Sequence, residues 1–119
     1  MCIRDSYYRG QPTSAAGGFG GLVFQGGIAY NLGIGLGENP YNYGRGWFPC
    51  FDNFIERSTY DFTVITNGNR RGYCVGTFLE ETNDNGVFTR TYSLDQEIPT
   101  YLAGIAVGNF TSWLSLIHI

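Results

Sequence analysis

The residue types that carry hydrolytic or metal chemistry are scarce in this sequence. Its one histidine is His118, and no His-Glu-x-x-His pattern occurs. A hydrolytic zinc site commonly takes two histidines and a carboxylate from the protein, and a cysteine nucleophile needs a histidine as its base. The paired acids, such as Glu80 with Glu81, fall at expected strand ends and in loops, where they are solvated. We therefore expect no catalytic and no metal-ligating residue in this chain.

Two cysteines lie in the interior of the sequence, Cys50 and Cys74, and they form no Cys-x-x-Cys motif. They could pair as one disulfide in an oxidising compartment. The alternative is that both are free, buried thiols that behave as small hydrophobic side chains.

Both ends of the sequence fit poorly with what they flank. Residues 1–6 and 114–119 look like translated sequencing-adapter read-through, which is excluded from fold reasoning in the same way as a cloning scar. We expect a partial domain over residues 7–113 with an artefactual tail at each end; a native start and an apolar edge strand at the finish are the alternative. In that case the native amino terminus is absent, so the sequence does not indicate where the protein is located, and it could be an exported protein.

The composition excludes several classes of protein. Hydrophobic residues make up 43% of the chain and aromatic residues 17%, which is too much apolar surface for a disordered chain. The net charge of -3 argues against a nucleic-acid partner, which needs a basic face. No run of 18 apolar residues is present, so we expect no membrane span.

Short strands separated by turn residues are the dominant pattern. The clearest strand is Ser58–Thr66, where Tyr60, Phe62 and Val64 alternate with Asp61, Thr63 and Ile65. Two short strands are expected at 20–24 and 28–32 around a Gln-Gly-Gly turn, and a short extended segment at 46–51. Residues 72–79 are expected to be the hairpin partner of 58–66, and an Asn-Asp-Asn-Gly turn leads into a strand at 87–94. A loop at 95–99 then precedes a strand at 101–110 in a central position of the sheet. The spacing predicts an all-β, antiparallel, multi-sheet sandwich or saddle-like domain that is incomplete.

Two motifs carry specific information. Residues 45–52 read Arg-Gly-Trp-Phe-Pro-Cys-Phe-Asp, and residues 98–110 read Ile-Pro-Thr-Tyr-Leu-Ala-Gly-Ile-Ala-Val-Gly-Asn-Phe. They resemble the R-x-W-F-P-C-x-D segment and the I-P-x-Y-L-x-x-x-x-V-G-x-F strand in the amino-terminal β domain of the aminopeptidase N family of zinc metallopeptidases. The order and separation of the two motifs also fit that family.

The residues of the motifs are structural in this interpretation. Arg45 can pair with Asp52 if Pro49 turns the chain between them. Four aromatic side chains, Trp47, Phe48, Phe51 and Phe54, are expected to fill the seam between the sheets. The structural residues are therefore Arg45, Trp47, Pro49, Cys50, Asp52 and Tyr101.

The resemblance implies a role beside a catalytic domain. In the family, the amino-terminal domain packs on a thermolysin-like catalytic domain that holds zinc, and it walls one side of the peptide-substrate cleft. A Gln or Glu four or five residues before the motif arginine often receives the substrate's α-amino group. Here those positions are Pro40 and Tyr41, and the nearest acid is Glu38. Either Glu38 binds the α-amino group, or this protein does not recognise the amino terminus of a substrate in that way. Glu38 and Tyr41 are the candidates for residues that face the substrate.

The expected function is thus a non-catalytic domain of a zinc aminopeptidase-like protein. Its partners would be the catalytic domain of the same chain and, in the parent protein, a peptide; the cofactor would be zinc in the parent only. The alternative is a free-standing, aromatic-rich β-sandwich that binds carbohydrate or protein. Its stacking platform would use Tyr7, Tyr8, Tyr41, Tyr43 and Trp47.

Overall fold

The structure is a computed structural model of the chain, and it describes residues 4–11, 21–34 and 42–111. The proposed tail at 114–119 and the first three residues of the proposed tail at 1–6 lie outside the described residues. No helix in the described ranges is long and apolar enough to cross a membrane.

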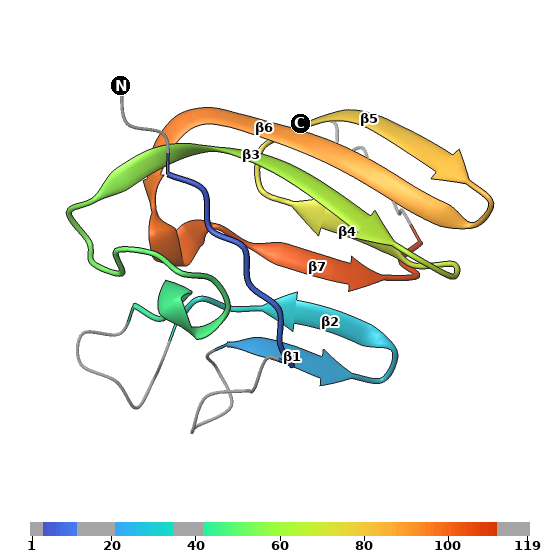
Figure 1. Cartoon of the computed structure of the whole chain (residues 1–119), viewed down its shortest axis with the longest axis horizontal. Coiled ribbons are helices and arrows are strands. Elements are labelled where there is room, and N and C mark those ends of the chain that lie inside the picture. The colour runs from blue at the N-terminus through green and yellow to red at the C-terminus, as the bar shows by residue number, and fades with distance from the viewer. Residues whose placement is uncertain (1–3, 12–20, 35–41, 112–119) are drawn as a thin grey trace, which may run out of the picture.

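The described residues form two antiparallel β-sheets and two short 3-10 turns (Figure 1). The strand order is β1-β2-β7-β4 in the four-stranded sheet and β3-β6-β5 in the three-stranded sheet. The strands are β1 (Leu22–Gln25), β2 (Ile28–Asn31), β3 (Arg57–Thr66), β4 (Arg71–Cys74), β5 (Thr77–Asp84), β6 (Val87–Pro99) and β7 (Ile105–Gly108), and the turns are η1 (Gly44–Gly46) and η2 (Thr100–Leu102). The predicted all-β, antiparallel, multi-sheet class is therefore confirmed.

Two hairpins close at turns that the sequence marks. Gly26 and Gly27 join β1 to β2 with φ angles of 60° and 82°, and Asn85 and Gly86 join β5 to β6 with φ angles of 55° and 87°. Two consecutive residues with positive φ give a tight turn whose twist matches that of the flanking strands, and glycine and asparagine adopt this conformation most readily. Both predicted turns are confirmed.

The segment 72–79 is not the single hairpin partner of β3 that its alternation predicts. It divides into β4, which pairs with β7, and β5, which pairs with β6 in the other sheet. The break lies at Gly76, which has a φ of 103° and whose missing Cβ would lie 2.6 Å from the carbonyl oxygen of Ser93. Alternation continues across this break, so the period-two pattern gave no sign that the chain changes sheets.

Three other predicted boundaries differ. Residues 95–99 are not a loop but the end of β6, because Ile98 and Pro99 pair with Ser58 and Arg57 of β3 beyond a bulge. The segment 46–51 forms no strand: Gly46 ends η1, and residues 47–51 are a turn, a bend and irregular chain. The segment 101–110 begins with η2, and only Ile105–Gly108 is a strand, although it takes the predicted central position between β2 and β4.

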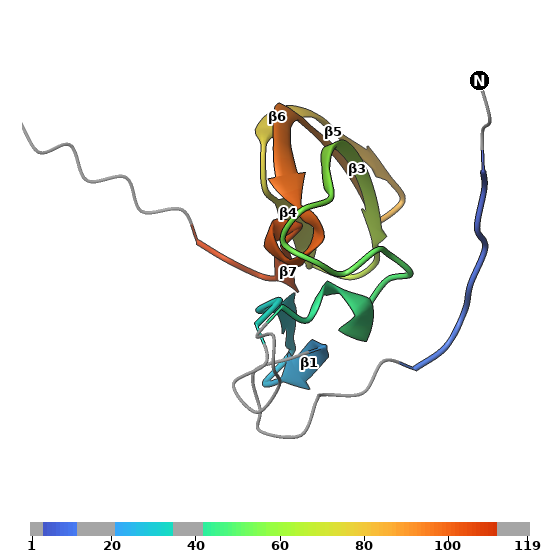
Figure 2. The ribbon, with the colours of Figure 1, turned by 90° about the vertical axis from the view of Figure 1, so that its left-hand side faces the viewer.

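The three-stranded sheet curves over the β4 edge of the four-stranded sheet (Figure 2). Gly72 of β4 lies directly under Val64, whose Cβ is 2.7 Å from the position that a Cβ on Gly72 would occupy. The Tyr92 hydroxyl donates a hydrogen bond to the Gly72 carbonyl oxygen over 3.1 Å. Phe88 and Tyr92 of β6 are buried. The core is therefore built where β4 enters the concave face of the three-stranded sheet.

An arginine occupies the centre of this core. The Arg90 guanidinium lies 4.5 Å from the centroid of the Tyr73 ring and 4.6 Å from that of Phe78. Its side chain is 13% exposed, and its Nη1 lies 3.7 Å from Glu81 Oε1, which also accepts a 2.9 Å hydrogen bond from Arg71. Ring faces attract a desolvated guanidinium. Arg90 thus joins β4, β5 and β6 in a place where most domains use an aliphatic side chain.

We predict that Gly72→Ala lowers the free energy of unfolding by about 1–3 kcal/mol, because the added methyl group would overlap Val64 in a packed interface. Chemical denaturation measures the change. The matched control is Gly104→Ala, where the nearest atom, Val75 Cγ1, lies at an ordinary 3.5 Å. Equal stability of the two variants would contradict the close approach of β3 to β4.

Candidate functional site

The two motif segments meet at one end of the sheets, where η1 lies against η2 (Figure 1). The contact is made by five residues that we call the Asp52 corner: Asn42, Gly44, Arg45, Asp52 and Thr100. Asp52 follows η1 in an irregular loop, and Thr100 begins η2 directly after β6. Residues almost fifty positions apart in the sequence are therefore held together by one side chain.

The Asp52 carboxylate accepts hydrogen bonds at both oxygens. Oδ1 lies 3.2 Å from the Gly44 backbone nitrogen and 3.3 Å from the Thr100 hydroxyl. Oδ2 lies 3.2 Å from the Arg45 backbone nitrogen and 2.8 Å from Arg45 Nη1, which is the ion pair that the motif spacing predicts. The Asp52 side chain is only 4% exposed, whereas that of Arg45 is 44% exposed. The buried anion is thus the centre of the corner, and the arginine closes it from the solvent side.

These bonds set the charge state of Asp52. Burial raises the pKa of the carboxyl, but hydrogen bonds from the backbone and side chain of Arg45, from Gly44 and from Asn42 outweigh it, so the pKa lies below its ordinary value of 3.8. Asp52 is therefore ionised at neutral pH and carries no proton for acid catalysis. Both of its oxygens already accept hydrogen bonds from residues of the same chain.

Asn42 supports the corner from inside. It is fully buried, and its side-chain amide donates a hydrogen bond to the Asp52 carbonyl oxygen. Arg45 Nη1 donates to the Asn42 carbonyl oxygen over 2.9 Å. Asn42 also forms a β-bridge with Ile34, so the corner is tied to the segment that follows β2.

A second buried asparagine connects β2 to the other side of the corner. Asn31 donates from its side-chain amide to the Ala103 carbonyl oxygen over 3.2 Å and accepts a 2.6 Å bond from the Ile105 backbone N–H. These two bonds fix the chain where η2 passes into β7. The β2 end, η1 and η2 are consequently one hydrogen-bonded unit.

The aromatic residues of the motif only partly fill a seam. The Trp47 ring packs edge-on against Phe48 with centroids 4.7 Å apart, and both are half-buried. The expectation is wrong for Phe51 and Phe54, which are 78% and 47% exposed. A polar contact holds the loop at Phe51, whose carbonyl oxygen lies 3.2 Å from the Thr100 hydroxyl, while its ring is mostly exposed.

The other predicted residues take separate places. Tyr101 lies in η2 with its ring edge-on to Phe54 at 5.4 Å, Pro49 is exposed and Cys50 is half-buried. Glu38 and Tyr41 lie outside the described residues. The structure thus brings Arg45, Asp52 and the Tyr101 segment together and gives no position for the two substrate-facing candidates.

Three polar residues of this region were missed by sequence reasoning. Thr100 occupies the unspecified position of the second motif, so the motif gave no sign of its hydroxyl contact with Asp52. Asn31 is almost fully buried and Asn42 is fully buried, yet asparagine is a residue type that usually indicates an exposed turn. Only the pairing of distant segments reveals their role.

Cys50 and Cys74 are free thiols, which is the second of the two alternatives. Burial raises the pKa of both groups, and that of Cys74 reaches about 11 despite the nearby positive charge of Arg90. Since the thiolate is the reactive form, neither thiol is suited to be a nucleophile at neutral pH.

The described residues contain no group of three or more His, Cys, Asp or Glu side chains that could hold a metal ion. They therefore do not fit a zinc site. In the same region the Asp52 carboxylate is ionised and accepts hydrogen bonds at both oxygens, so its chemistry is that of an anchor for the surrounding loops.

Known proteins were compared at the level of sequence and of fold. The chain matches no protein-family model and no curated protein. Among solved structures it is similar to the M1 zinc metallopeptidase from Deinococcus radiodurans bound to a Tyr-Ser-Ala substrate, with 28% identity and a TM-score of 0.64 over 75% of this chain. It is also similar to a two-domain M1 zinc metallopeptidase bound to L-tryptophan, with 28% identity and a TM-score of 0.69 over 83% of this chain.

This likeness confirms the resemblance to the aminopeptidase N-like, M1 zinc metallopeptidases. The chain covers 19% of the first structure's chain and 22% of the second's. It corresponds in size to one domain of such an enzyme, about a fifth of its length.

We predict that Asp52→Asn lowers the free energy of unfolding by about 1–3 kcal/mol at pH 7, because the donors of the corner lose their charged acceptor. The carboxyl has a lower pKa in the folded chain than its ordinary 3.8, so its contribution is present above that value and is lost as the pH falls through the lower folded pKa. The variant should lose less stability than the wild type between about pH 5 and pH 2. Urea denaturation across this range measures both effects. An equal loss in Asp95→Asn, an exposed carboxylate, would contradict a specific role for Asp52.

We also predict slow alkylation of Cys74. With a pKa of about 11, about 0.1% of the thiol is ionised at pH 8, so iodoacetamide should modify it far more slowly in the folded chain than in urea. Peptide mapping by mass spectrometry after timed labelling measures the rate. Rapid modification of Cys74 in the folded chain, or a Cys50–Cys74 disulfide under oxidising conditions without loss of structure, would overturn this account.

Proposed function

We propose that the chain is a non-catalytic amino-terminal domain of a zinc-dependent aminopeptidase-like protein. It packs on the catalytic domain and helps to wall the peptide-substrate cleft. One observation carries the proposal: the two family motifs meet in the Asp52 corner, in a fold shared with M1 zinc metallopeptidases over 75–83% of this chain. In this proposal residues 7–113 are the domain, and residues 1–6 and 114–119 are foreign to it.

The non-catalytic role is supported by the extent of the likeness, because this chain covers only 19% and 22% of the similar M1 zinc metallopeptidase chains. Zinc, the hydrolytic cofactor of the parent, is accordingly assigned to the catalytic domain. The work of the described residues is to hold their own loops in place, because both oxygens of the Asp52 carboxylate accept hydrogen bonds from residues of the same fold.

The peptide substrate is inferred from the similar enzymes, one of which is bound to Tyr-Ser-Ala. The Asp52 corner fixes the chain at Asn42, immediately after the segment that carries Glu38 and Tyr41. We place these two residues toward the substrate. A glutamate can pair with an ammonium group, and a tyrosine hydroxyl can accept a hydrogen bond from it.

The alternative of a carbohydrate-stacking module finds less support. A sugar needs the open face of an aromatic ring, whereas the Tyr43 ring lies under the Arg45 guanidinium at 4.7 Å. Trp47 is packed against Phe48. Two of the five proposed platform rings are therefore already engaged.

The test is a graft into the Deinococcus radiodurans enzyme. Removing the segment that matches this chain should abolish its hydrolysis of amino-acid arylamides, and grafting residues 7–113 of this chain in its place should restore part of that activity. The Asp52→Ala graft should lose the restored activity, while the Asp95→Ala graft should keep it.

The purified 119-residue chain should show no hydrolysis of amino-acid arylamides with or without added zinc. Turnover by the pure chain would overthrow the non-catalytic role. A folded graft that leaves the enzyme inactive would overthrow the proposed packing on a catalytic domain.

A further inference from the structure

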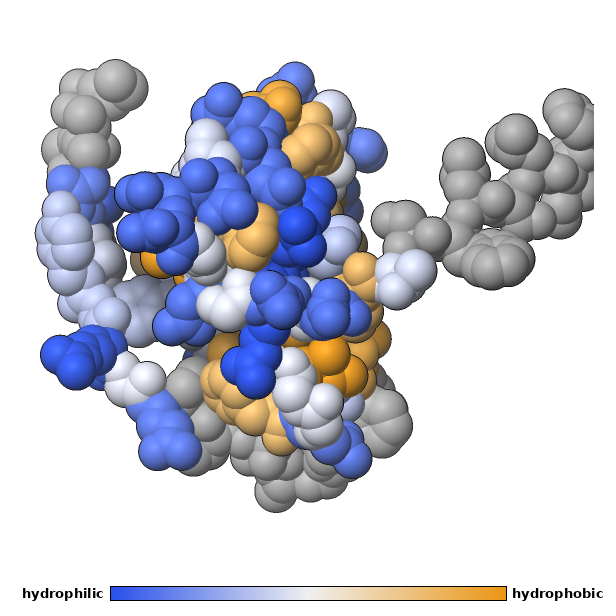
Figure 3. Space-filling model, turned by 90° about the vertical axis from the view of Figure 1, so that its right-hand side faces the viewer, coloured by the Kyte–Doolittle hydropathy of each residue, from blue (hydrophilic) through white to orange (hydrophobic). Residues whose placement is uncertain are grey.

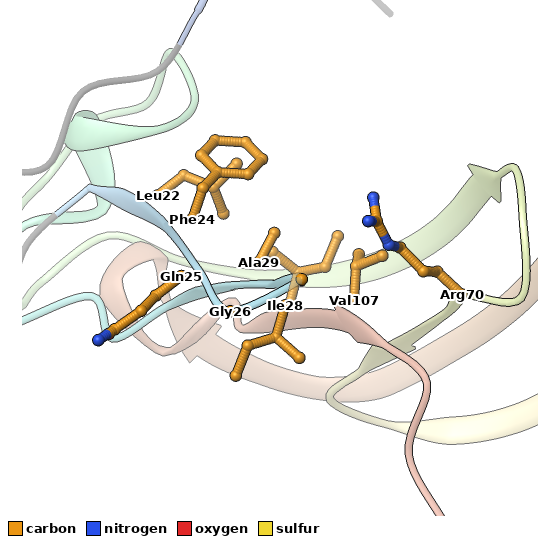
Figure 4. A pocket seen from close by; sticks show the side chains of 10 residues that line it. Leu22, Phe24, Gln25, Gly26, Ile28, Ala29, Arg70 and Val107 are labelled. Atoms are coloured by element: carbon orange, nitrogen blue, oxygen red, sulfur yellow. The ribbon is translucent and has the colours of Figure 1, made fainter.

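One face of the four-stranded sheet is left largely uncovered beyond β4 by the residues that the structure describes. The register places Phe24, Ala29, Val107 and Gly72 opposite one another on β1, β2, β7 and β4, so their side chains share a face. Leu22 and Ile105 lie on the same face one row away. Val64 of the other sheet covers the Gly72 end of this face, and next to it the face forms a recess of about 450 Å³ (Figure 4). We call it the Arg70 recess.

The floor of the recess is apolar. Leu22, Phe24, Ala29, Ile105 and Val107 supply it, and Phe24 is 63% exposed. Figure 3, which faces the hairpin ends, shows apolar surface gathered over the lower part of the molecule and polar residues above it. An apolar patch with a polar rim is typical of a surface that another segment covers.

Arg70 provides the polar rim. It is exposed, and it precedes Gly72 by two residues, which places it on the same side as Val107 in Figure 4. Its neighbour Arg71 is paired with Glu81. Among the described residues, no carboxylate forms an ion pair with Arg70. The recess therefore presents an apolar floor and one unpaired positive charge at its end.

The shape of the recess and the length of the similar enzymes indicate what covers it. It is an open surface on a sheet, whereas a small ligand is usually enclosed on most of its sides. The similar M1 structures have about four fifths of their chains beyond the part that this chain covers. A segment of a larger protein therefore suits this open surface better than a small ligand does.

We infer that the Arg70 recess seats a peptide segment of the catalytic part of the parent protein, in which apolar side chains flank an acidic residue. The apolar side chains cover Phe24 and Val107, and the acidic residue pairs with Arg70. This inference rests on the proposed function, because the segment comes from the parent.

The test uses the 119-residue chain labelled with ¹⁵N and two peptides, Ac-Ser-Leu-Glu-Leu-Phe-Gly-Ser-NH₂ and the same peptide with Gln in place of Glu. Two-dimensional amide spectra should show saturable shifts at Ala29 and Val107. The Glu peptide should bind about threefold more tightly, as expected for an exposed ion pair.

Variants separate the two halves of the recognition. Arg70→Gln should remove the preference for the Glu peptide, and Arg57→Gln, an exposed arginine on β3, should keep it. Phe24→Ser should weaken both peptides about tenfold, whereas Leu79→Ser, which has a similar exposure of 59%, should not. Because Arg70 is exposed, Arg70→Gln keeps the test valid if Phe24→Ser does not fold.

Three outcomes would overturn the inference: shifts confined to other surfaces, no preference for the Glu peptide, or no saturable binding at millimolar concentration. Dodecanoate that binds in the recess and excludes both peptides would make it a fatty-acid site instead.

The graft experiment reports separately on the proposed function. If the graft is active but the peptides do not bind, the recess inference is wrong and the proposed function stands. If the graft is inactive but the peptides bind, the segment that fills the recess does not come from the parent protein.

Discussion

The fold of this domain depends on one buried carboxylate. Asp52 sits at the point where two loops must close, and it accepts hydrogen bonds from Gly44, from the Arg45 backbone and side chain, and from Thr100. Main-chain N–H groups that lose water need an acceptor, and a carboxylate serves several at once. The Arg45 guanidinium then offsets the charge without entering the interior. A buried anion with this many donors specifies a single arrangement of η1 and η2.

A second polar junction joins the two sheets. Arg90 lies between the rings of Tyr73 and Phe78, and the Tyr92 hydroxyl reaches the Gly72 carbonyl oxygen at the β4 edge. The two junctions share β6, which carries Arg90 in its middle and runs directly into Thr100. A shift of the three-stranded sheet would therefore be transmitted to the Asp52 corner.

The parts of the structure that sequence reasoning could predict are those that local patterns determine. The alternation in Ser58–Thr66 and the glycine turns gave the strands and two hairpins, and the motif spacing gave the Arg45–Asp52 pair. The change of sheet at Gly76 escaped because the same alternation continues on both sides of it. The roles of Asn31, Asn42 and Thr100 escaped because each depends on a partner about ten to seventy positions away. The ring of Phe51 is mostly exposed because its loop is held by a hydrogen bond at the Phe51 carbonyl oxygen, which the residue types do not reveal.

The distribution of apolar surface connects this fold to the role proposed for it. Among the described residues, the buried hydrophobic side chains are Phe88, Tyr92 and Ala103, while Phe24, Ile65 and Leu79 are more than half exposed. A domain of this size gains most of its stability from burying apolar area, and so small a core leaves little margin. Polar junctions can fix the geometry of such a domain, but they contribute modestly to its net stability. The remaining stabilisation is then best supplied by a surface that covers the open sheet face, which is the contribution that a catalytic domain would make.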